Sequence, residues 1–408
     1  MPVNLIAPEK RNILPIRGIK LGVASAGIKT VGQFDLVLIE LSADTISSAI
    51  YTQNAFCAAP VTLAKQHQSE VSPRYLLINS GNANAGTGDK GMLAAQVCCQ
   101  AVAELSALNS NTVLPFSTGV IGQLLPVGKI KTALPDAYQN LATDNWFAAA
   151  QAIMTTDIIA KAISKQIDID GETITVTGIA KGSGMIRPDM ATMLSYIATD
   201  AAVEKPVLDT MLLKSANQSF NRISVDGDTS TNDACVLMAT GQAANMVISN
   251  FDSANAQALY QVIAEVSQHL AHAIVRDGEG ATKFIEIEVT QGQNTEECRQ
   301  VAYTIAHSPL VKTALFASDP NWGRILAAVG RSGISDFDLS KVTIYLGTVC
   351  IVNGGEPATD YTEEKGQQVT SQDEILIRVV LGRGEASDTV WTCDFSYDYV
   401  KINAEYRS

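Results

Sequence analysis

The chain has 408 residues, of which 46% are hydrophobic and 17% are charged; this is typical of a globular protein and excludes an intrinsically disordered one. The formal net charge is −13, and Lys and Arg form no cluster, which argues against nucleic acid as a partner. No apolar run approaches the about 20 residues that cross a membrane, and the first residues lack the pattern of a signal peptide. We therefore expect a cytoplasmic protein without a membrane segment that acts on small molecules.

Cysteines and histidines give no sign of a metal site. The seven cysteines are scattered without a CxxC pair, and the four histidines include no HExxH pattern. His269 and His272 lie three residues apart in a segment with helical periodicity, but no acidic residue or cysteine is an evident third ligand. We expect reduced cysteines, no metal and no cofactor.

The hydrophobic pattern predicts alternating strands and helices. Strands are predicted over residues 36–40, 75–79, 173–179, 193–198, 235–240 and 284–289, and residues 114–121 are predicted as a strand that runs into a Gly-containing turn. Helices are predicted over residues 89–108, 206–221, 259–274 and 299–316, the last with Pro309 as a residue that can break it. The C-terminal part is predicted to form mostly strands, over residues 342–351, 375–381 and 389–395. This order favours an α/β protein with layered mixed sheets rather than one parallel sheet.

Residues 181–200 contain the densest group of unusual residues in the chain. The predicted strand before Lys181 runs into a Gly-Ser-Gly turn, which is followed by an Arg-Pro-Asp segment and a new apolar strand. Gly182 and Gly184 permit backbone angles that are closed to other residues, and Pro188 fixes its own φ. Such a loop can hold a peptide bond under strain at the edge of a sheet.

Thr192 follows this loop and can act as a nucleophile. Its hydroxyl can attack the carbonyl of Ala191, and hydrolysis of the resulting ester would release Thr192 as a new N-terminus. The α-amine, with a pKa near about 8, would then serve as the general base without a histidine. From the local sequence alone, Thr192 is better explained as a β-branched residue that begins a strand.

A resemblance over nearly the whole chain decides between these two interpretations. Residues 181–194 resemble the cleavage and nucleophile segment of the ornithine acetyltransferase (glutamate N-acetyltransferase) family of bifunctional arginine biosynthesis proteins. Further segments resemble that family in the family's own order: residues 79–88, 117–122, 154–157, 225–233, 276–282, 319–325 and 397–407. The resemblance implies that residues 1–191 and 192–408 are the two products of self-cleavage between Ala191 and Thr192, and not independent domains. Strand pairing across the break is expected to hold these products together.

The resemblance implies acetyl transfer in two steps. N-acetylornithine would donate its acetyl group to Thr192, ornithine would leave, and glutamate would take the acetyl group to become N-acetylglutamate. Some family members also accept acetyl-CoA as a donor. The implied fold consists of mixed sheets sandwiched by helices, similar in outline to N-terminal-nucleophile hydrolases. The implied assembly is a heterotetramer with two copies of each cleavage product.

The resemblance also implies roles for individual residues. Thr118 and Gly119 are expected to form an oxyanion hole, in which fixed donors stabilise a tetrahedral acyl intermediate. Together with Thr192, the expected substrate-binding residues are Thr155, Lys181, Glu279, Asn403 and Ser408. Of these, Lys181 suits a substrate carboxylate and Glu279 suits the distal ammonium of ornithine. Ser408 stands where the family often has threonine, and either residue supplies a hydroxyl.

Two further segments are expected to support the site. Residues 79–88 are rich in Asn and Gly but match no phosphate-binding loop, so we expect a tight turn near the active site. Trp322 and Arg324 are expected to have a structural role or to lie at an interface.

Two other interpretations of the chain remain open. A self-processing threonine amidase or aminopeptidase would differ only because water, and not an amine, removes the acyl group from Thr192. A non-catalytic acidic binding module would use the same loops without cleavage, and its chain would stay intact.

Overall fold

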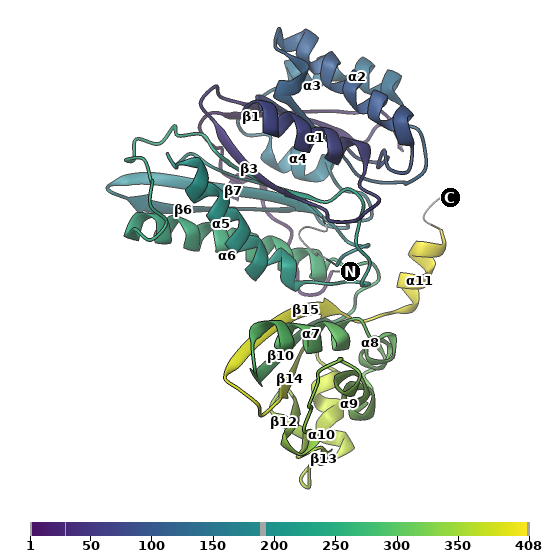
Figure 1. Ribbon diagram of the computed structural model, residues 1–408. Helices are drawn as coiled ribbons and strands as arrows, with labels where there is room; N and C mark the ends of the chain where they lie inside the picture. Colours follow the sequence, from purple (N-terminus) through teal and green to yellow (C-terminus); the bar gives the residue numbers. More distant parts are fainter. Residues whose placement is uncertain (1, 29, 188–192, 406–408) are drawn as a thin grey trace.

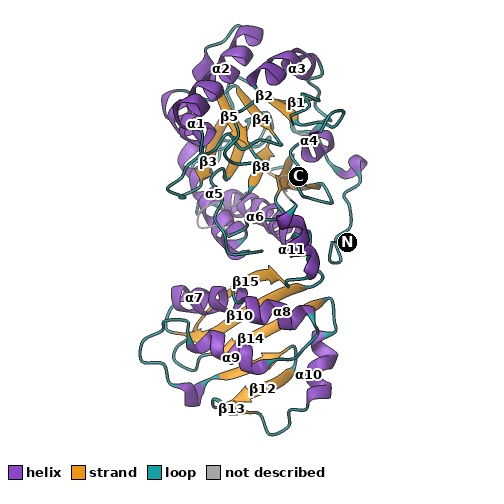
Figure 2. Cartoon of the chain, turned by 90° about the vertical axis from the view of Figure 1, so that its right-hand side faces the viewer, coloured by secondary structure: helices purple, strands orange, loops and turns teal. Residues whose placement is uncertain are grey.

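The computed structural model describes residues 2–28, 30–187 and 193–405, which form two lobes (Figures 1 and 2). The larger lobe contains two sheets, and the smaller lobe contains a third. Between the lobes, the Asp394 carboxylate accepts hydrogen bonds from the amides of Thr282 and Lys283, at 2.8 Å each. This carboxylate ties together the two segments through which the chain enters and leaves the smaller lobe.

The first sheet of the larger lobe has four strands. Its order is β1 (Ile19–Ala24), β2 (Leu36–Leu41), β4 (Tyr75–Asn79) and β5 (Val113–Ser117). The β4 and β5 strands run parallel, whereas the other pairs are antiparallel. Helices α1 (Ala59–Glu70), α2 (Gly88–Ser106) and α3 (Val127–Gln139) cover its outer face (Figure 1).

The second sheet of the larger lobe has five strands. Its order is β3 (Ile46–Tyr51), β9 (Ala234–Ala239), β8 (Leu194–Thr199), β7 (Glu172–Lys181) and β6 (Lys161–Ile169). Helices α5 (Lys205–Gln218) and α6 (Ala254–Arg276) pack on its outer face, and α4 (Trp146–Ala152) lies on the inner side. The larger lobe is therefore a layered structure in which helices enclose two facing sheets.

The core between the two sheets explains why their strands are almost wholly apolar. Side chains of β2, β4 and β5 meet those of β7, β8 and β9 in one buried cluster. Within it, the rings of Phe116 and Tyr196 pack edge to face with centroids 5.4 Å apart. Because each sheet also buries its outer face under helices, its central strands read as continuous apolar runs.

The smaller lobe is built on a six-stranded mixed sheet. Its order is β13 (Glu356–Pro357), β12 (Val349–Asn353), β11 (Thr343–Leu346), β14 (Glu374–Val380), β10 (Phe284–Gly292) and β15 (Ala386–Cys393). Four helices accompany it: α7 (Thr295–Ala306), α8 (Pro309–Phe316), α9 (Trp322–Gly330) and α10 (Glu363–Thr370). The chain then returns toward the larger lobe as α11 (Tyr397–Ala404), which has no buried residue (Figure 2).

The predicted α/β class with mixed sheets and enclosing helices is confirmed. Two predicted elements were wrong in extent. The helix over residues 299–316 is two helices, because Pro309 begins α8 and the Ser308 side chain caps it. The strand over residues 342–351 is a hairpin of β11 and β12, with Gly347 at φ 55° between them. In the segment 114–121, the strand β5 ends at Ser117 and is followed by the predicted Gly-containing turn, with Gly119 at φ 130°.

Strands from both sides of position 191 share the five-stranded sheet. Lys181 at the end of β7 pairs with Leu194 at the start of β8, and β3 pairs with β9 along six residues. The lobes therefore do not correspond to residues 1–191 and 192–408. No helix among the described residues is long and apolar enough to cross a membrane.

Candidate active site

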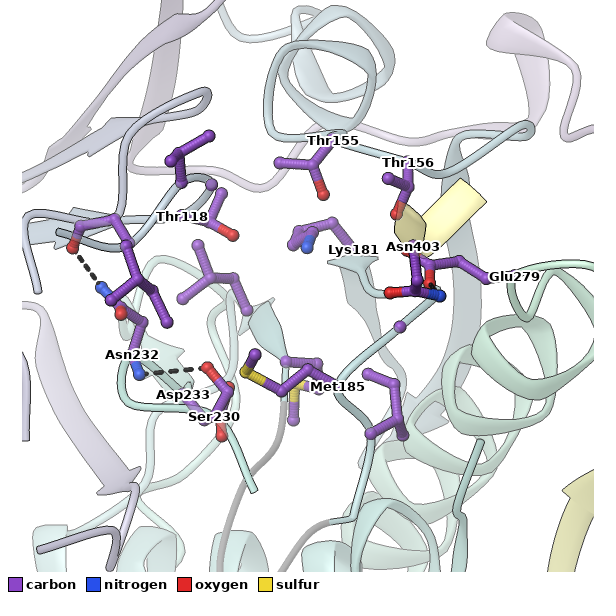
Figure 3. A pocket seen from close by; sticks show the side chains of 18 residues that line it. Thr118, Thr155, Thr156, Lys181, Met185, Ser230, Asn232, Asp233, Glu279 and Asn403 are labelled. Carbon is purple, nitrogen blue, oxygen red and sulfur yellow. Dashed lines mark hydrogen bonds between the residues drawn. The ribbon is translucent and has the colours of Figure 1, made fainter. Parts of the chain in front are cut away.

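A cavity of about 240 Å³ opens in the larger lobe where the ends of several strands meet. Six residues to which the sequence analysis gave a functional role line it (Figure 3): Thr118, Gly119, Thr155, Lys181, Glu279 and Asn403. They come from five separate segments of the chain, so only the fold brings them together. Ala191, Thr192 and Ser408 lie outside the described residues, but Met193 and Leu194, which follow Thr192 in sequence, also line the cavity.

Thr118 and Gly119 form a turn directly after β5. Gly119 has φ 130°, and a Cβ placed there would lie 2.3 Å from the carbonyl carbon of Gly81. Only glycine therefore fits this position. The close approach of the two backbones brings the turn against the segment that follows β4, and the Thr118 amide donates to the Asn79 carbonyl at 3.0 Å.

The Asn-rich segment after β4 supports this turn, as expected for a tight turn near the site. Asn82 pairs with both Thr118 and Val120 through isolated bridges, and the Asn79 side-chain amide donates to the Asn82 carbonyl at 2.9 Å. From the segment before β9, the Asn232 side chain donates to the carbonyls of Ala83 at 2.6 Å and Ser117 at 3.0 Å. These contacts hold the backbone of the Thr118 turn at the cavity wall, and a fixed backbone is one requirement of a preorganised oxyanion site.

Lys181 ends β7 with a buried side chain that faces the cavity. Burial lowers the pKa of this ammonium, whereas Asp157, Asp233 and Glu279 oppose that change. Among the described residues, no carboxylate lies within ion-pair distance of it. A buried cation that faces a cavity without such a partner is suited to an anionic ligand.

Glu279 lies in the loop after α6 and is itself buried. Its amide donates to the Ser183 carbonyl at 2.8 Å, and its carboxylate accepts from the side-chain amide of Asn403 at 2.8 Å. Gly184 leaves the space for this carboxylate, because a Cβ there would lie 2.4 Å from the Glu279 Cδ. Asn403, on α11, thus closes the cavity at the Glu279 end (Figure 3).

The sequence analysis assigned no role to Asp233, which the structure places in the cavity wall. This carboxyl is buried, its Oδ2 has no hydrogen-bond partner among the described residues, and burial raises its pKa well above the usual value. The next residue, Ala234, donates its amide to the Met193 carbonyl at 2.9 Å. Asp233 therefore lies beside the start of β8. The segment over residues 225–233 stood out only as part of a resemblance, and nothing in an isolated Asp shows that it is buried.

The titratable residues considered for a metal have other surroundings. His272 packs against the rings of Phe284 and Trp391, with centroids 5.3 Å and 4.6 Å away. Within the described ranges, no group of three His, Cys, Asp or Glu side chains could hold a metal ion, and the seven cysteines are free thiols. Trp322 and Arg324 lie at the start of α9 in the smaller lobe, away from the cavity. Trp322 packs against the core of that lobe, and Arg324 donates to the Leu310 carbonyl.

A cavity with fixed backbone, a buried cation and a buried carboxylate around it suits the active site of an enzyme better than a surface for a partner. Residues 20–408 match the ArgJ family, and the chain belongs to that family. The proteins of this family are acyltransferases of arginine biosynthesis, and so is this chain.

Similar proteins match over almost their whole length. The arginine biosynthesis bifunctional protein ArgJ of Pseudomonas syringae pv. tomato is 56% identical over 394 residues, which are 97% of either chain. The protein of the same name from Psychrobacter arcticus is 55% identical and is covered to 99%, as is this chain. The crystal structure of the Bacillus halodurans ArgJ protein is 42% identical with a TM-score of 0.50, over 53% of this chain and 100% of that one.

Proposed function

We propose that this enzyme transfers the acetyl group of N-acetylornithine to glutamate through an acetyl ester of Thr192, after self-cleavage between Ala191 and Thr192. One observation carries the proposal: the cavity gathers Thr118, Gly119, Thr155, Lys181, Glu279 and Asn403 beside Met193. A free N-terminus at Thr192 would be one residue away from a cavity-lining residue. The role of the relatives in arginine biosynthesis agrees with these substrates.

The charges of the cavity suit the two ends of an N-acetylornithine molecule. Lys181 and Glu279 both line the cavity (Figure 3); Lys181 would receive the α-carboxylate, and Glu279 would receive the distal ammonium. Both side chains are buried, so a substrate that lacks either charge would leave an uncompensated group in a site of low dielectric. The acetamide, which is on the same carbon as the carboxylate, would then lie at the Lys181 end, within reach of the Thr118 turn (Figure 3).

The reaction balances without a cofactor. The Thr192 hydroxyl attacks the acetyl carbonyl as its proton passes to the Thr192 α-amine, and the Gly119 amide with the Thr118 hydroxyl stabilises the oxyanion. The C–N bond breaks, and the leaving α-amine of ornithine takes up that proton. The α-amine of glutamate then attacks the acetyl ester, and the hydroxyl of Thr192 is restored.

Comparing two acceptors in one assay tests the proposal. We would incubate N-acetyl-L-ornithine with the enzyme, with and without L-glutamate, and measure ornithine, N-acetylglutamate and acetate. Transfer predicts equal amounts of ornithine and N-acetylglutamate, and very little acetate when glutamate is absent. Release of acetate at the same rate with or without glutamate would instead identify a threonine amidase. A third mixture with acetyl-CoA in place of N-acetylornithine tests whether the thioester is a second donor.

The proposal includes an assembly of two copies of each cleavage product in the cytoplasm, where amino-acid biosynthesis takes place. Light scattering on the native enzyme tests the assembly. Its mass should equal two full-length chains if this part of the proposal is right.

A further inference from the structure

Three side chains form a buried ionic cluster directly behind the cavity. The Lys161 ammonium lies 2.6 Å from a carboxylate oxygen of Asp157 and 2.6 Å from one of Asp277. All three side chains have no exposed surface. Burial of three charges costs free energy that a well-packed apolar group would not, so the cluster calls for an explanation other than stability.

The cluster joins three segments that carry cavity residues. The Asp157 carboxylate accepts from the Gly182 amide at 2.8 Å and from the Thr155 amide at 3.1 Å. The Asp277 carboxylate accepts from the Ile158 amide at 3.0 Å. In addition, the Ser183 hydroxyl donates to the Asp277 carbonyl at 2.6 Å. Thr155, Lys181 and Glu279 each lie within two residues of one of these contacts.

The cluster also carries a net charge, because two carboxylates surround one ammonium. The opposite charge nearby is that of Lys181, next to Gly182 in sequence. Four charged groups from four segments act on the Lys181 ammonium: Asp157, Lys161 on β6, Asp233 just before β9 and Glu279 after α6. Burial lowers the pKa of Lys181, and among these groups Asp157 opposes that change most strongly. Lys161 and Lys181 in turn hold the pKa of Asp157 below its usual value, against the effect of burial.

We propose that Asp157, held by Lys161 and Asp277, is a positioning residue that keeps the Lys181 side chain charged and in place to bind the substrate carboxylate. The inference rests on the proposed function in one respect, because it takes Lys181 as the group that receives that carboxylate. In this proposal Asp157 does not contact the substrate. It acts through its charge on Lys181 and through its hydrogen bonds with the amides of Gly182 and Thr155.

The sign of the pH effect follows from the charges. Without the negative charge of Asp157, the Lys181 ammonium would lose its proton at lower pH. Carboxylate binding would then be lost earlier as the pH rises, while at low pH Lys181 would be charged in both proteins. A purely structural role would instead lower activity by the same factor at every pH.

The test is the pH profile of kcat/KM for N-acetyl-L-ornithine in the Asp157→Asn variant, which keeps the shape of the side chain. We expect the alkaline limb to move to lower pH. At pH values well above the limb, activity should fall by up to about 10-fold for each pH unit that the limb moves, and this loss should shrink toward wild-type activity near pH 6.5. Asp388→Asn is a matched control, because Asp388 joins Arg222 and Arg299 in a partly buried cluster away from the cavity. A loss that is constant with pH, or one that Asp388→Asn reproduces, would overturn the proposal.

Two measurements keep the result interpretable. If Asp157→Asn does not fold, Asp157→Ser removes the same negative charge with a smaller side chain and should move the limb in the same direction; an unmoved limb then contradicts the proposal. Calorimetric binding of L-ornithine at pH 6.5 and pH 9 requires no catalysis. It would show the same pH-dependent loss in Asp157→Asn even if wild-type enzyme failed to transfer acetyl groups, so failure of the proposed function and failure of this inference can be told apart.

Discussion

At the scale of single residues, the Glu279 carboxylate shows how closely the cavity is built around one group. Asn403 binds it from α11, Ser183 fixes its backbone, and the missing side chain of Gly184 gives it room. If Glu279 binds the distal ammonium of ornithine, Glu279→Gln removes a charge-assisted hydrogen bond of about 2 kcal/mol, or about 30-fold in KM. Self-cleavage, which is measured by the intact mass of the protein, should be much less affected. Equal loss of both would mean that Glu279 serves the fold.

Gly184→Ala tests the same contact from the other side. The added methyl group would lie 2.4 Å from the Glu279 Cδ, so the carboxylate must move. We expect KM for N-acetyl-L-ornithine to rise at least as much as in Glu279→Gln. Gly128→Ala is the control, because a Cβ at Gly128 meets no atom within 4 Å and KM should not change. An unaltered KM in Gly184→Ala would show that the position of Glu279 does not matter for binding.

The sequence predicted part of this site because some residues stand in unusual local patterns. Thr118, Lys181 and Glu279 lie next to glycines in segments with a recognisable resemblance. Asp157 and Asp233 also lie in such segments, but they have no neighbouring glycine, and their importance comes from burial and from neighbours that are distant in sequence. A carboxylate that is paired behind a cavity and one on the surface look the same in a single sequence.

At the scale of elements, continuous apolar runs made β2, β4 and β8 predictable, because these strands are buried on both faces. β1, β3, β6 and the two-residue β13 were not predicted, and polar residues explain β3 and β6. β3 buries Ser47 and Ser48, and the Ser48 hydroxyl donates to Asp209 at 2.5 Å, so its interior side looks polar. β6 begins with the buried Lys161, whose burial depends on Asp157 and Asp277. A strand whose polar residues are paired with distant parts of the chain cannot be predicted from its hydrophobic pattern.

Deletion of helix α11 should lower activity much more than stability. The helix has no buried residue, and its main packing is the stacking of Tyr399 on Phe395 and of Tyr397 on the edge of Phe316. Such ring pairs contribute about 1 kcal/mol each, so deletion of residues 397–408 should cost about 2 kcal/mol of unfolding free energy. Acetyl transfer should fall far more, because Asn403 is lost. Chemical denaturation and the acetyl-transfer assay on the same truncated protein check this, and activity near the wild-type value would remove α11 from the site.

At the scale of the whole molecule, the layered α/β class was predictable from the order of strands and helices, but the two lobes were not. The smaller lobe depends on contacts between residues more than 100 positions apart in sequence, such as those of Asp394 with Thr282 and Lys283. The five-stranded sheet contains β3, β6 and β7 from before position 191, and β8 and β9 from after it. The hydrophobic cores on the two faces of this sheet also contain side chains from both sides of position 191.

This arrangement predicts the behaviour of cleaved enzyme. Residues 1–191 and 192–408 should elute together in native gel filtration and separate only in denaturant, because separation would break the β7–β8 and β3–β9 pairs and expose both cores. Elution of the two products apart under native conditions would contradict the sheet topology.

The most direct test of Thr192 as the nucleophile is the denatured intact mass of the enzyme before and after brief incubation with N-acetyl-L-ornithine alone. We expect two species that match residues 1–191 and 192–408, of which only the second gains one acetyl group, and the gain should disappear when L-glutamate is added. The Thr192→Ala variant should give a single full-length species that gains nothing. A cleaved or active Thr192→Ala protein, or an acetyl group on the first product, would contradict the assignment of Thr192 as the nucleophile.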